Sequence, residues 1–174
     1  MKTRRSVFAV RAAVAAFVFG GCATGAGQPA ETFIEEVAVA AYHYLISDVF
    51  RGDPHGVRPF CFLYHPDDNF ERPPRGAGID PPVGVMVELQ RNYPTARRGS
   101  ECAIDYAVPG DPRVEAADRP IIYRVGQVIL RRRGEAEVAV GYHFHGLNAA
   151  GRRCTARRAA AGWRITSCES GWVS

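Results

Sequence analysis

The chain of 174 residues lacks any uninterrupted apolar run of about 18 residues, which excludes a conventional membrane-spanning helix. No short sequence period recurs along it, which excludes solenoid and propeller folds. Its composition is that of an ordinary globular protein, with 47% hydrophobic and 23% charged residues, and its length suits a single domain. The sequence therefore predicts one small folded body, and no residue pattern in it fixes a reaction or a ligand.

The body of the chain also lacks a net charge. The formal charge of +4 is carried by four basic residues near the start: Lys2, Arg4, Arg5 and Arg11. The remaining 18 basic residues balance 18 acidic ones, so no nucleic-acid partner is expected. Residues 22–118 hold 8 arginines and 15 acids, whereas residues 119–174 hold 10 arginines and 3 acids. We expect these two parts to face each other within one fold.

The first 21 residues have the order of a bacterial export signal. The cationic segment Met1–Arg11 is followed by the apolar segment Ala12–Phe19, which is too short to span a bilayer. Gly20, Gly21 and Cys22 come next, and small residues before a cysteine resemble the lipobox, after whose cleavage the cysteine becomes the lipidated N-terminus. We therefore expect an exported protein that is anchored to the bacterial cell membrane through a lipid on Cys22.

Two alternatives for this leader stay open. Phe19 stands where a lipobox usually has leucine, and cleavage after Ala26 would release a secreted protein without an anchor. The stretch TRRSVF, with Arg4 and Arg5 adjacent, also resembles a twin-arginine export signal. In the favoured interpretation the chain divides into an export signal (1–21), a small-residue flexible tether (22–30) and one domain (31–174).

Four cysteines follow the leader, an even number that suits disulfides in an oxidising compartment. Cys154 and Cys168 are equidistant from the middle of a tight turn predicted at Ala160–Gly162. They should lie opposite each other in a β-hairpin, close enough to bond. Cys61 and Cys102 then pair by exclusion.

Hydrophobic periodicity and turn residues divide the domain into helices, strands and loops. A first helix begins at Thr32, whose spacing from Glu35 is that of a capping box, and runs to about Phe50. A second begins at Asp80, before two prolines, and ends near Asn92. The expected strands are Val57–His65, Cys102–Val108, Ile121–Leu130, Ala136–Gly146, Arg152–Ala160 and Trp163–Ser174, and the expected loops are Pro66–Gly78 and Pro109–Pro120. This order predicts an α+β fold, in which a strongly curved, mostly antiparallel sheet wraps around the helices.

The C-terminal strands resemble those of a known superfamily. The segments EAEVAVGYHFHGLNAAGRRCTARR and RAAAGWRITSCESGWVS are similar to the final strands of the nuclear transport factor 2 superfamily, which includes ketosteroid isomerase and polyketide cyclases. Many exported bacterial lipoproteins of unassigned role carry a similar pattern. Element order is similar over residues 31–174, but the specific part is about the last 40 residues. The resemblance implies a cone-shaped roll with room for a pocket, and it implies no chemistry, because the superfamily contains enzymes and inert binding modules alike.

A candidate zinc site lies on the predicted C-terminal strands. His143 and His145 share one strand face, and a hairpin register that pairs Leu147 with Arg152 places His145 opposite Cys154. Cysteines in an oxidising compartment bond each other more often than they bind metal, and a His-x-His pair is often just a solvent face. We therefore expect no metal ion and no cofactor.

An enzyme in a cone-shaped fold needs an acid or a base that points into its pocket. Strand alternation instead places His143 and Asp105 away from the apolar face. The exceptions are Asp48, near the apolar stripe of the first helix, and Arg157, which the same register puts beside Tyr142. A helix-end charge and a snorkelling rim residue are the alternative interpretations. Asp48, Arg157 and Tyr142 are thus candidate contacts for a ligand or an anion, and no catalytic residue is assigned.

Two further charged segments have more than one interpretation. Arginines gather in the C-terminal part of the chain: Arg131–Arg133, Arg152, Arg153, Arg157 and Arg158. Such a cluster can bind anionic lipid headgroups beside an anchor. It also forms solvated strand edges, or balances acids of the same chain. The loop His65–Glu71 lacks the spacing of a calcium loop and is expected to be a solvated turn.

These observations favour a lipid-anchored, non-enzymatic module of the cell envelope that binds a protein partner or a small ligand in its cone. The alternative is a small pocket enzyme of the ketosteroid isomerase or polyketide cyclase type. A deep cavity in which a carboxylate and a second titratable group converge would favour the enzyme. A cone that is filled by side chains would favour the binding module.

Overall fold

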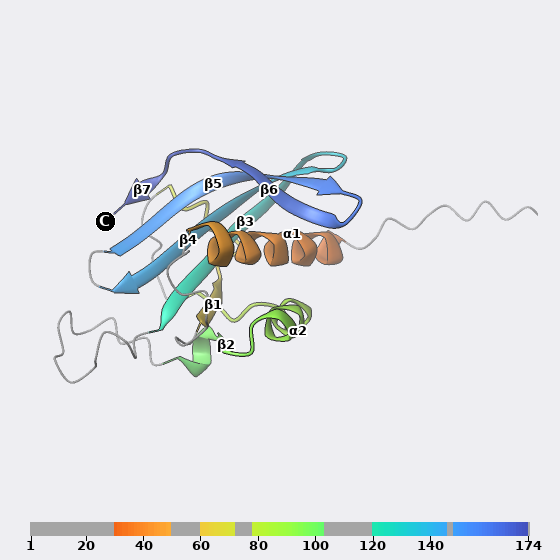
Figure 1. Cartoon of the computed structure of the whole chain (residues 1–174). Coiled ribbons are helices and arrows are strands. Elements are labelled where there is room, and N and C mark those ends of the chain that lie inside the picture. Colours follow the sequence, from red (N-terminus) through yellow and green to blue (C-terminus); the bar gives the residue numbers. More distant parts are fainter. Residues whose placement is uncertain (1–29, 50–59, 72–77, 103–119, 146–147, 174) are drawn as a thin grey trace, which may run out of the picture.

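The computed structural model describes residues 30–49, 60–71, 78–102, 120–145 and 148–173 (Figure 1). Its helices are α1 (Ala30–Tyr44), which continues into a π-helical turn (Leu45–Val49), and α2 (Val83–Asn92), and a 3-10 turn covers Gly99–Glu101. Its strands are β1 (Phe60–Tyr64), β2 (Ala96–Arg98), β3 (Ile121–Arg132), β4 (Glu135–His145), β5 (Asn148–Ala159), β6 (Gly162–Cys168) and β7 (Trp172–Val173). The chain therefore has the predicted α+β class.

The strands form one mixed, seven-stranded sheet in the order β2-β1-β3-β4-β5-β6, and β7 also pairs with β5. Strands β3 to β6 are the predicted antiparallel meander. Strand β1 instead runs parallel to both β2 and β3, and α2 is the crossover that lets β2 return parallel to β1. The sequence analysis missed this β-α-β unit.

Helix α1 lies across one face of the sheet, where it contacts β3, β4, β5 and β6, and α2 lies beside α1 and β2 (Figure 1). We call the face that α1 covers the inner face and the opposite one the outer face. Within the described part of the chain, no helix is both long and apolar enough to cross a membrane.

The predicted apolar stripe of α1 is confirmed. Val37, Ala41 and Leu45 recur every four residues, so they lie on one side of the helix, and each is at most 1% exposed. Ala38, also buried, is small and lets the helix backbone approach the sheet closely. Through this stripe α1 belongs to the larger cluster of buried hydrophobic side chains, which we call the main core.

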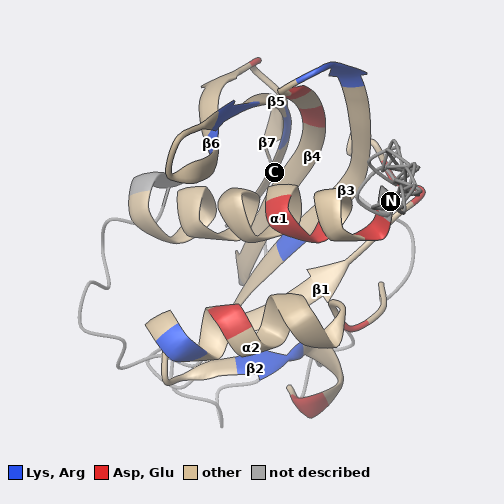
Figure 2. Cartoon of the chain, turned by 90° about the vertical axis from the view of Figure 1, so that its right-hand side faces the viewer, with Lys and Arg blue, Asp and Glu red and all other residues tan. Residues whose placement is uncertain are grey.

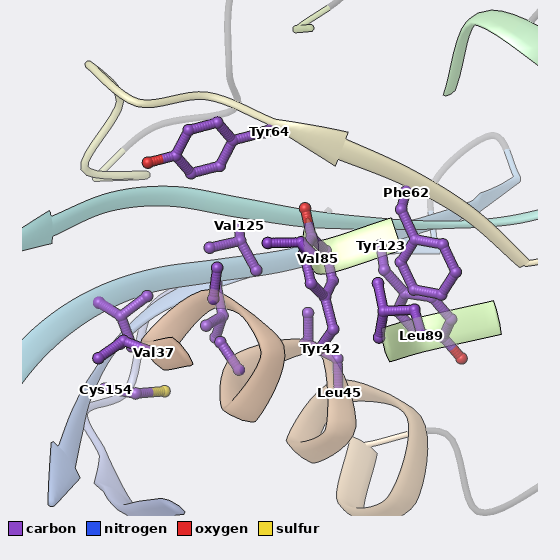
Figure 3. Close-up of a cluster of buried hydrophobic side chains, with 14 of the residues drawn as sticks. Val37, Tyr42, Leu45, Phe62, Tyr64, Val85, Leu89, Tyr123, Val125 and Cys154 are labelled. Carbon is purple, nitrogen blue, oxygen red and sulfur yellow. The ribbon is translucent and has the colours of Figure 1, made fainter. Parts of the chain in front are cut away.

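Aromatic rings fill the space between α1 and the sheet (Figure 3). Tyr42 of α1 meets Phe62 of β1 edge to face, with ring centroids 5.0 Å apart. Phe62 in turn stacks on Tyr123 of β3 at 5.7 Å. The hydroxyl of Tyr42 donates a hydrogen bond of 2.7 Å to the carbonyl oxygen of Leu63, so its polar end is satisfied although it is buried. The core is thus a packed layer of large side chains.

Both helices begin at residues other than those predicted. Helix α1 starts at Ala30, so the capping box at Thr32 and Glu35 is wrong. Helix α2 starts after Pro82, which occupies the N-cap position without a side-chain cap. Asp80 does not cap it, because its carboxylate accepts hydrogen bonds from the backbone N–H and the hydroxyl of Ser100, at 2.9 and 2.6 Å. The bonds of Asp80 tie the start of α2 to the 3-10 turn.

The β5–β6 hairpin places Cys154 opposite Cys168, and the two form a disulfide. The turn is shorter than predicted, because Ala159 already pairs with Gly162, whose φ of 111° suits glycine. A bulge between Ala156 and Thr155 then shifts the register by one residue and restores the opposition of the cysteines. Both predicted disulfides are present, since Cys61 bonds Cys102.

The predicted register between the β4 and β5 strands is wrong. Cys154 pairs with Val138, not with His145, because β5 begins at Asn148 rather than at Arg152. The shift is by an odd number of residues, so it moves Cys154 from the predicted histidine face to the inner face. Trp163–Ser174 is likewise two strands, β6 and β7, rather than one.

The loop His65–Glu71 is exposed at Pro66, Asp67, Asn69 and Glu71, as predicted, but it packs on the outer face of the sheet at two points. Phe70 is only 2% exposed. The carbonyl oxygen of Asp68 accepts a hydrogen bond of 2.7 Å from the backbone N–H of Gln127. This contact needs Gly126, where a Cβ would lie 2.2 Å from that oxygen. The prediction of a solvated turn is therefore correct for most of the loop and wrong for His65 and Phe70, which are buried.

Several predictions lie outside the described residues. They are the leader with Cys22 and the tether, residues 57–59 of the first strand, the strand residues 103–108 with Asp105, the loop 109–119, the hairpin residue Leu147, and the side chains of Asp48 and His145.

We expect the two disulfides to contribute unequally to stability. Cys61–Cys102 closes a segment with a sequence separation of 41, against 14 for Cys154–Cys168. The loss of loop entropy in the unfolded chain predicts about 4 kcal/mol for the first disulfide and about 3 kcal/mol for the second. Chemical denaturation of the paired variants Cys61→Ala/Cys102→Ala and Cys154→Ala/Cys168→Ala measures the difference. A larger loss of unfolding free energy in the second variant would contradict this order.

Candidate functional site

Side chains fill the interior between α1 and the sheet, where a pocket enzyme would hold its substrate. Tyr42, Phe62 and Tyr123 are fully buried there, together with Met86 and Leu89 of α2. Burial, reinforced by the charge of a neighbouring tyrosine, raises the pKa of Tyr42 well above its ordinary value, so its hydroxyl stays protonated. The interior is therefore a structural core.

A groove opens on the surface between α1, the first half of α2 and the β5–β6 turn. Its volume of about 600 Å³ lies in the range of small-molecule sites. Its lining combines apolar and charged side chains: Thr32, Glu35, Glu36, Val39, Ala40, His43, Gly84, Val85, Glu88, Arg158, Ala159–Gly162 and Trp163. We call it the helix groove.

Trp163 forms the wall of the helix groove on the side of the hairpin. It follows the glycine of the β5–β6 turn and meets Phe33 of α1 edge to face, with ring centroids 5.2 Å apart. Its indole N–H donates a hydrogen bond of 3.1 Å to a carboxylate oxygen of Glu36. The indole therefore holds Glu36 in place and joins the start of α1 to the hairpin.

Three carboxylates line the helix groove. Glu36 lies beside Trp163, with Arg158 3.9 Å away. Glu88 of α2 pairs with Arg91 at 2.5 Å. Glu35 lies against Gly84, where a Cβ would be only 2.7 Å from its carboxylate oxygen. Because Glu35 and Glu36 are adjacent on α1, one leans toward α2 and the other toward the hairpin.

His43 stands deeper in the same groove. Its Nδ1 shares a hydrogen bond of 2.9 Å with the hydroxyl of Tyr93, just after α2. Burial lowers the pKa of His43 below its ordinary value, although the nearby charge of Glu88 opposes the shift. The lowered pKa favours the neutral form of the imidazole, and the charged residues that line the groove are Glu35, Glu36, Glu88 and Arg158.

The structure does not bring the predicted contact residues together. Arg157 pairs with Glu135 at 3.1 Å, at the far end of β5 from the partner of Tyr142, which is Ala150. Tyr142 is half-buried and packs against the main core. Arg157 was placed beside Tyr142 by the register that proved wrong. No shared site of Arg157 and Tyr142 exists.

The predicted arginine cluster is largely paired with acids. Glu137 bonds Arg131 and lies 3.1 Å from Arg153, which also reaches Glu71 at 2.8 Å. Arg132 contacts Glu135 at 2.9 Å, as Arg157 does at 3.1 Å. Two of the contacts, Arg153 with Glu71 and Arg158 with Glu36, join the basic and the acidic parts of the chain, as the charge pattern predicts. The cluster is mainly a network within the fold.

The candidate zinc site does not form on the described strands. Cys154 is bonded to Cys168, and its side chain belongs to the main core. His143 pairs with Ile122 and Ala149, on the opposite face from Cys154. Among the described residues, no three His, Cys, Asp or Glu side chains are arranged to hold a metal ion.

Comparisons of the chain with protein-family models, with curated proteins and with solved structures found no match. The helix groove therefore has to be judged from its own residues. Sequence reasoning missed it because Glu36 and His43 occupy the side of α1 opposite the apolar stripe, which usually faces solvent. The one available signal was Trp163, a large aromatic residue directly after a hairpin glycine.

We expect the protein to lose stability as the pH falls from 7 through the ordinary histidine pKa of about 6.5. The pKa of His43 is lowered by burial, and that of His65 is lowered by burial and by Arg124, with Asp68 opposing. The unfolded chain takes up protons that these folded histidines do not, so the stability present above the ordinary histidine pKa is lost as pH falls toward the lowered values.

The free energy of unfolding should fall by up to about 1.4 kcal/mol per pH unit for each histidine. Urea denaturation at several pH values measures it, and His43→Gln and His65→Gln should each flatten the dependence. A stability that is constant or rises on acidification to pH 5.5 would contradict the assignment.

Proposed function

We propose that the protein is an exported, lipid-anchored, non-enzymatic module of the bacterial envelope that binds its ligand in the helix groove. In this proposal the domain is a cone of the nuclear transport factor 2 type. The order of the leader and the small residues before Cys22 support export and anchoring. The disulfides Cys61–Cys102 and Cys154–Cys168 suit an oxidising compartment.

One observation carries the choice of a binding module. The space under α1 is filled by side chains such as Tyr42 and Tyr123, whereas the helix groove is open at the surface. Acid-base catalysis gains from a desolvated pocket into which titratable groups converge. An open groove lined by charged and apolar groups is suited to holding a ligand rather than to enclosing a reaction.

A pocket enzyme is the second candidate, and His43 is the observation that favours it. A neutral imidazole near the carboxylate of Glu88 can accept a proton. Any activity of this kind requires His43, so loss of turnover in His43→Gln with ligand binding retained would identify an enzyme. A ligand that dissociates chemically unchanged from the wild type supports the module.

In this proposal the tether joins the domain at the start of α1, next to the helix groove. The chain enters α1 beside the β5–β6 turn, as the contact between Phe33 and Trp163 shows (Figure 1). Residues 22–30 span at most about 28 Å when extended. A lipid on Cys22 would therefore hold the helix groove within about 28 Å of the membrane surface, where it meets ligands of the envelope.

Labelling of cells with an alkyne fatty acid tests the anchor. We expect the wild type to incorporate the label and to sediment with membranes, and Cys22→Ala to do neither, because the variant lacks the thiol that the lipid modifies. Glu169→Gln is the control, since it changes an exposed residue far along the chain from Cys22 and should keep the label. An unlabelled wild type in the medium, with an N-terminus after Ala26, would contradict the proposal.

A further inference from the structure

The charged side chains that line the helix groove are mostly acidic. The groove is lined by three carboxylates, those of Glu35, Glu36 and Glu88, against the single guanidinium of Arg158. Figure 2 shows acidic segments on both α1 and α2, the two helices that border it. Arg91, outside the lining, pairs with Glu88, and Arg158 lies 3.9 Å from Glu36, so the groove keeps a net charge of about −1 and attracts cations.

The positions of the carboxylates indicate what kind of cation fits. The carboxylate of Glu36 is held at the hairpin wall by the indole N–H of Trp163, and that of Glu35 rests on Gly84 at the α2 wall. Adjacent residues of α1 thus present acceptors on both sides of the groove. An ammonium group donates up to three hydrogen bonds, so it can be shared between such acceptors.

The groove also has apolar surface between its charges. Val39 and Ala40 of α1 and Val85 of α2 line it, and the ring of Trp163 borders it. Methylene groups bury well on such surface, and an aromatic ring attracts a neighbouring cation. A hydrated inorganic ion uses neither feature, and the described acidic side chains are not arranged to hold a metal ion.

We infer that the helix groove binds an aliphatic amine, in which protonated amino groups meet the carboxylates of Glu35 and Glu36 and a methylene chain lies on the apolar surface. The inference rests on the proposed function, because it specifies the ligand of the same groove. Glu36 and Glu88 keep 38% and 40% of their side chains exposed, so an incoming ammonium group can reach them.

Calorimetric titration with spermidine tests the inference. The protein is the full chain carrying Cys22→Ala, which removes the lipid without touching the groove. An uncharged diol of the same chain length and Mg²⁺ are the comparison ligands. We expect spermidine to bind at least about tenfold more tightly than either, since the diol lacks the charge and the ion lacks the chain.

Substitutions locate the site. Glu35→Gln and Glu36→Gln should each weaken spermidine binding about tenfold, the loss expected for one charge-assisted hydrogen bond. Trp163→Phe should weaken it too, because the indole no longer holds Glu36. Glu169→Gln removes the same charge from an exposed residue outside the groove and should leave the affinity within about twofold. Each variant must melt within about 2 °C of its parent to be compared.

The outcomes separate this inference from the proposed function. Equal affinity for the diol overturns the selection for amines and leaves a groove ligand standing. An equal loss in Glu169→Gln shows diffuse attraction and overturns the site. Absence of spermidine binding overturns the inference. The proposed anchor is tested separately, by the incorporation of the alkyne fatty acid. Tight spermidine binding that only the groove variants weaken supports it.

Discussion

The packing of α1 on the inner face of the sheet is the contact on which the rest of the structure depends. Val37, Ala41 and Leu45 are buried along one side of the helix, and Tyr42 reaches β1 through its hydroxyl. Truncating a buried leucine such as Leu45 to alanine in a packed core costs about 2–5 kcal/mol. Because the helical repeat fixes which residues lie on the other sides of α1, the same contact places Glu35, Glu36 and His43 at the groove.

The hairpin that closes the groove is held in several ways. Trp163 bonds Glu36 and packs on Phe33, and the backbone N–H of Arg158 donates a hydrogen bond of 2.9 Å to the carbonyl oxygen of Gly134 in the β3–β4 turn. The Cys154–Cys168 disulfide fixes the other end of the hairpin. The wall of the groove is thus tied to the helix, to the neighbouring turn and to the core, which limits the reorganisation that a ligand has to overcome.

The sequence predicted what depends on local periodicity. The stripe of α1, the meander from β3 to β6 and the Cys154–Cys168 disulfide follow from spacing, Cys61–Cys102 follows by exclusion, and the structure contains all of them. The two-residue turn alone would have placed Cys154 opposite Ser167, so the pairing of Cys154 with Cys168 also depends on a β-bulge in the hairpin. No residue in the sequence indicates that bulge.

What depends on contacts between distant segments was not predictable. Asn148–Gly151 has the composition of a turn, but it forms the start of β5. The absence of a side chain at Gly151 leaves room for the ring of Trp172 to pack there. The longer β5 changes the register with β4, which separates Arg157 from Tyr142, so the predicted contact site does not form. The helix groove is formed where α1, α2 and the β5–β6 turn meet. The local sequence of each of these elements does not predict that the other two lie beside it.

Mapping the binding of spermidine by two-dimensional NMR tests most directly the central claim that ligands are held at the helix groove and not in the interior. The account predicts the largest shifts at the indole N–H of Trp163, at the backbone of Thr32–His43 and at Gly84. The indole of Trp172, outside the groove, serves as an internal reference and should move little. Shifts concentrated on the buried rings of Tyr42 and Tyr123, or on the outer face around Arg153, would contradict the account.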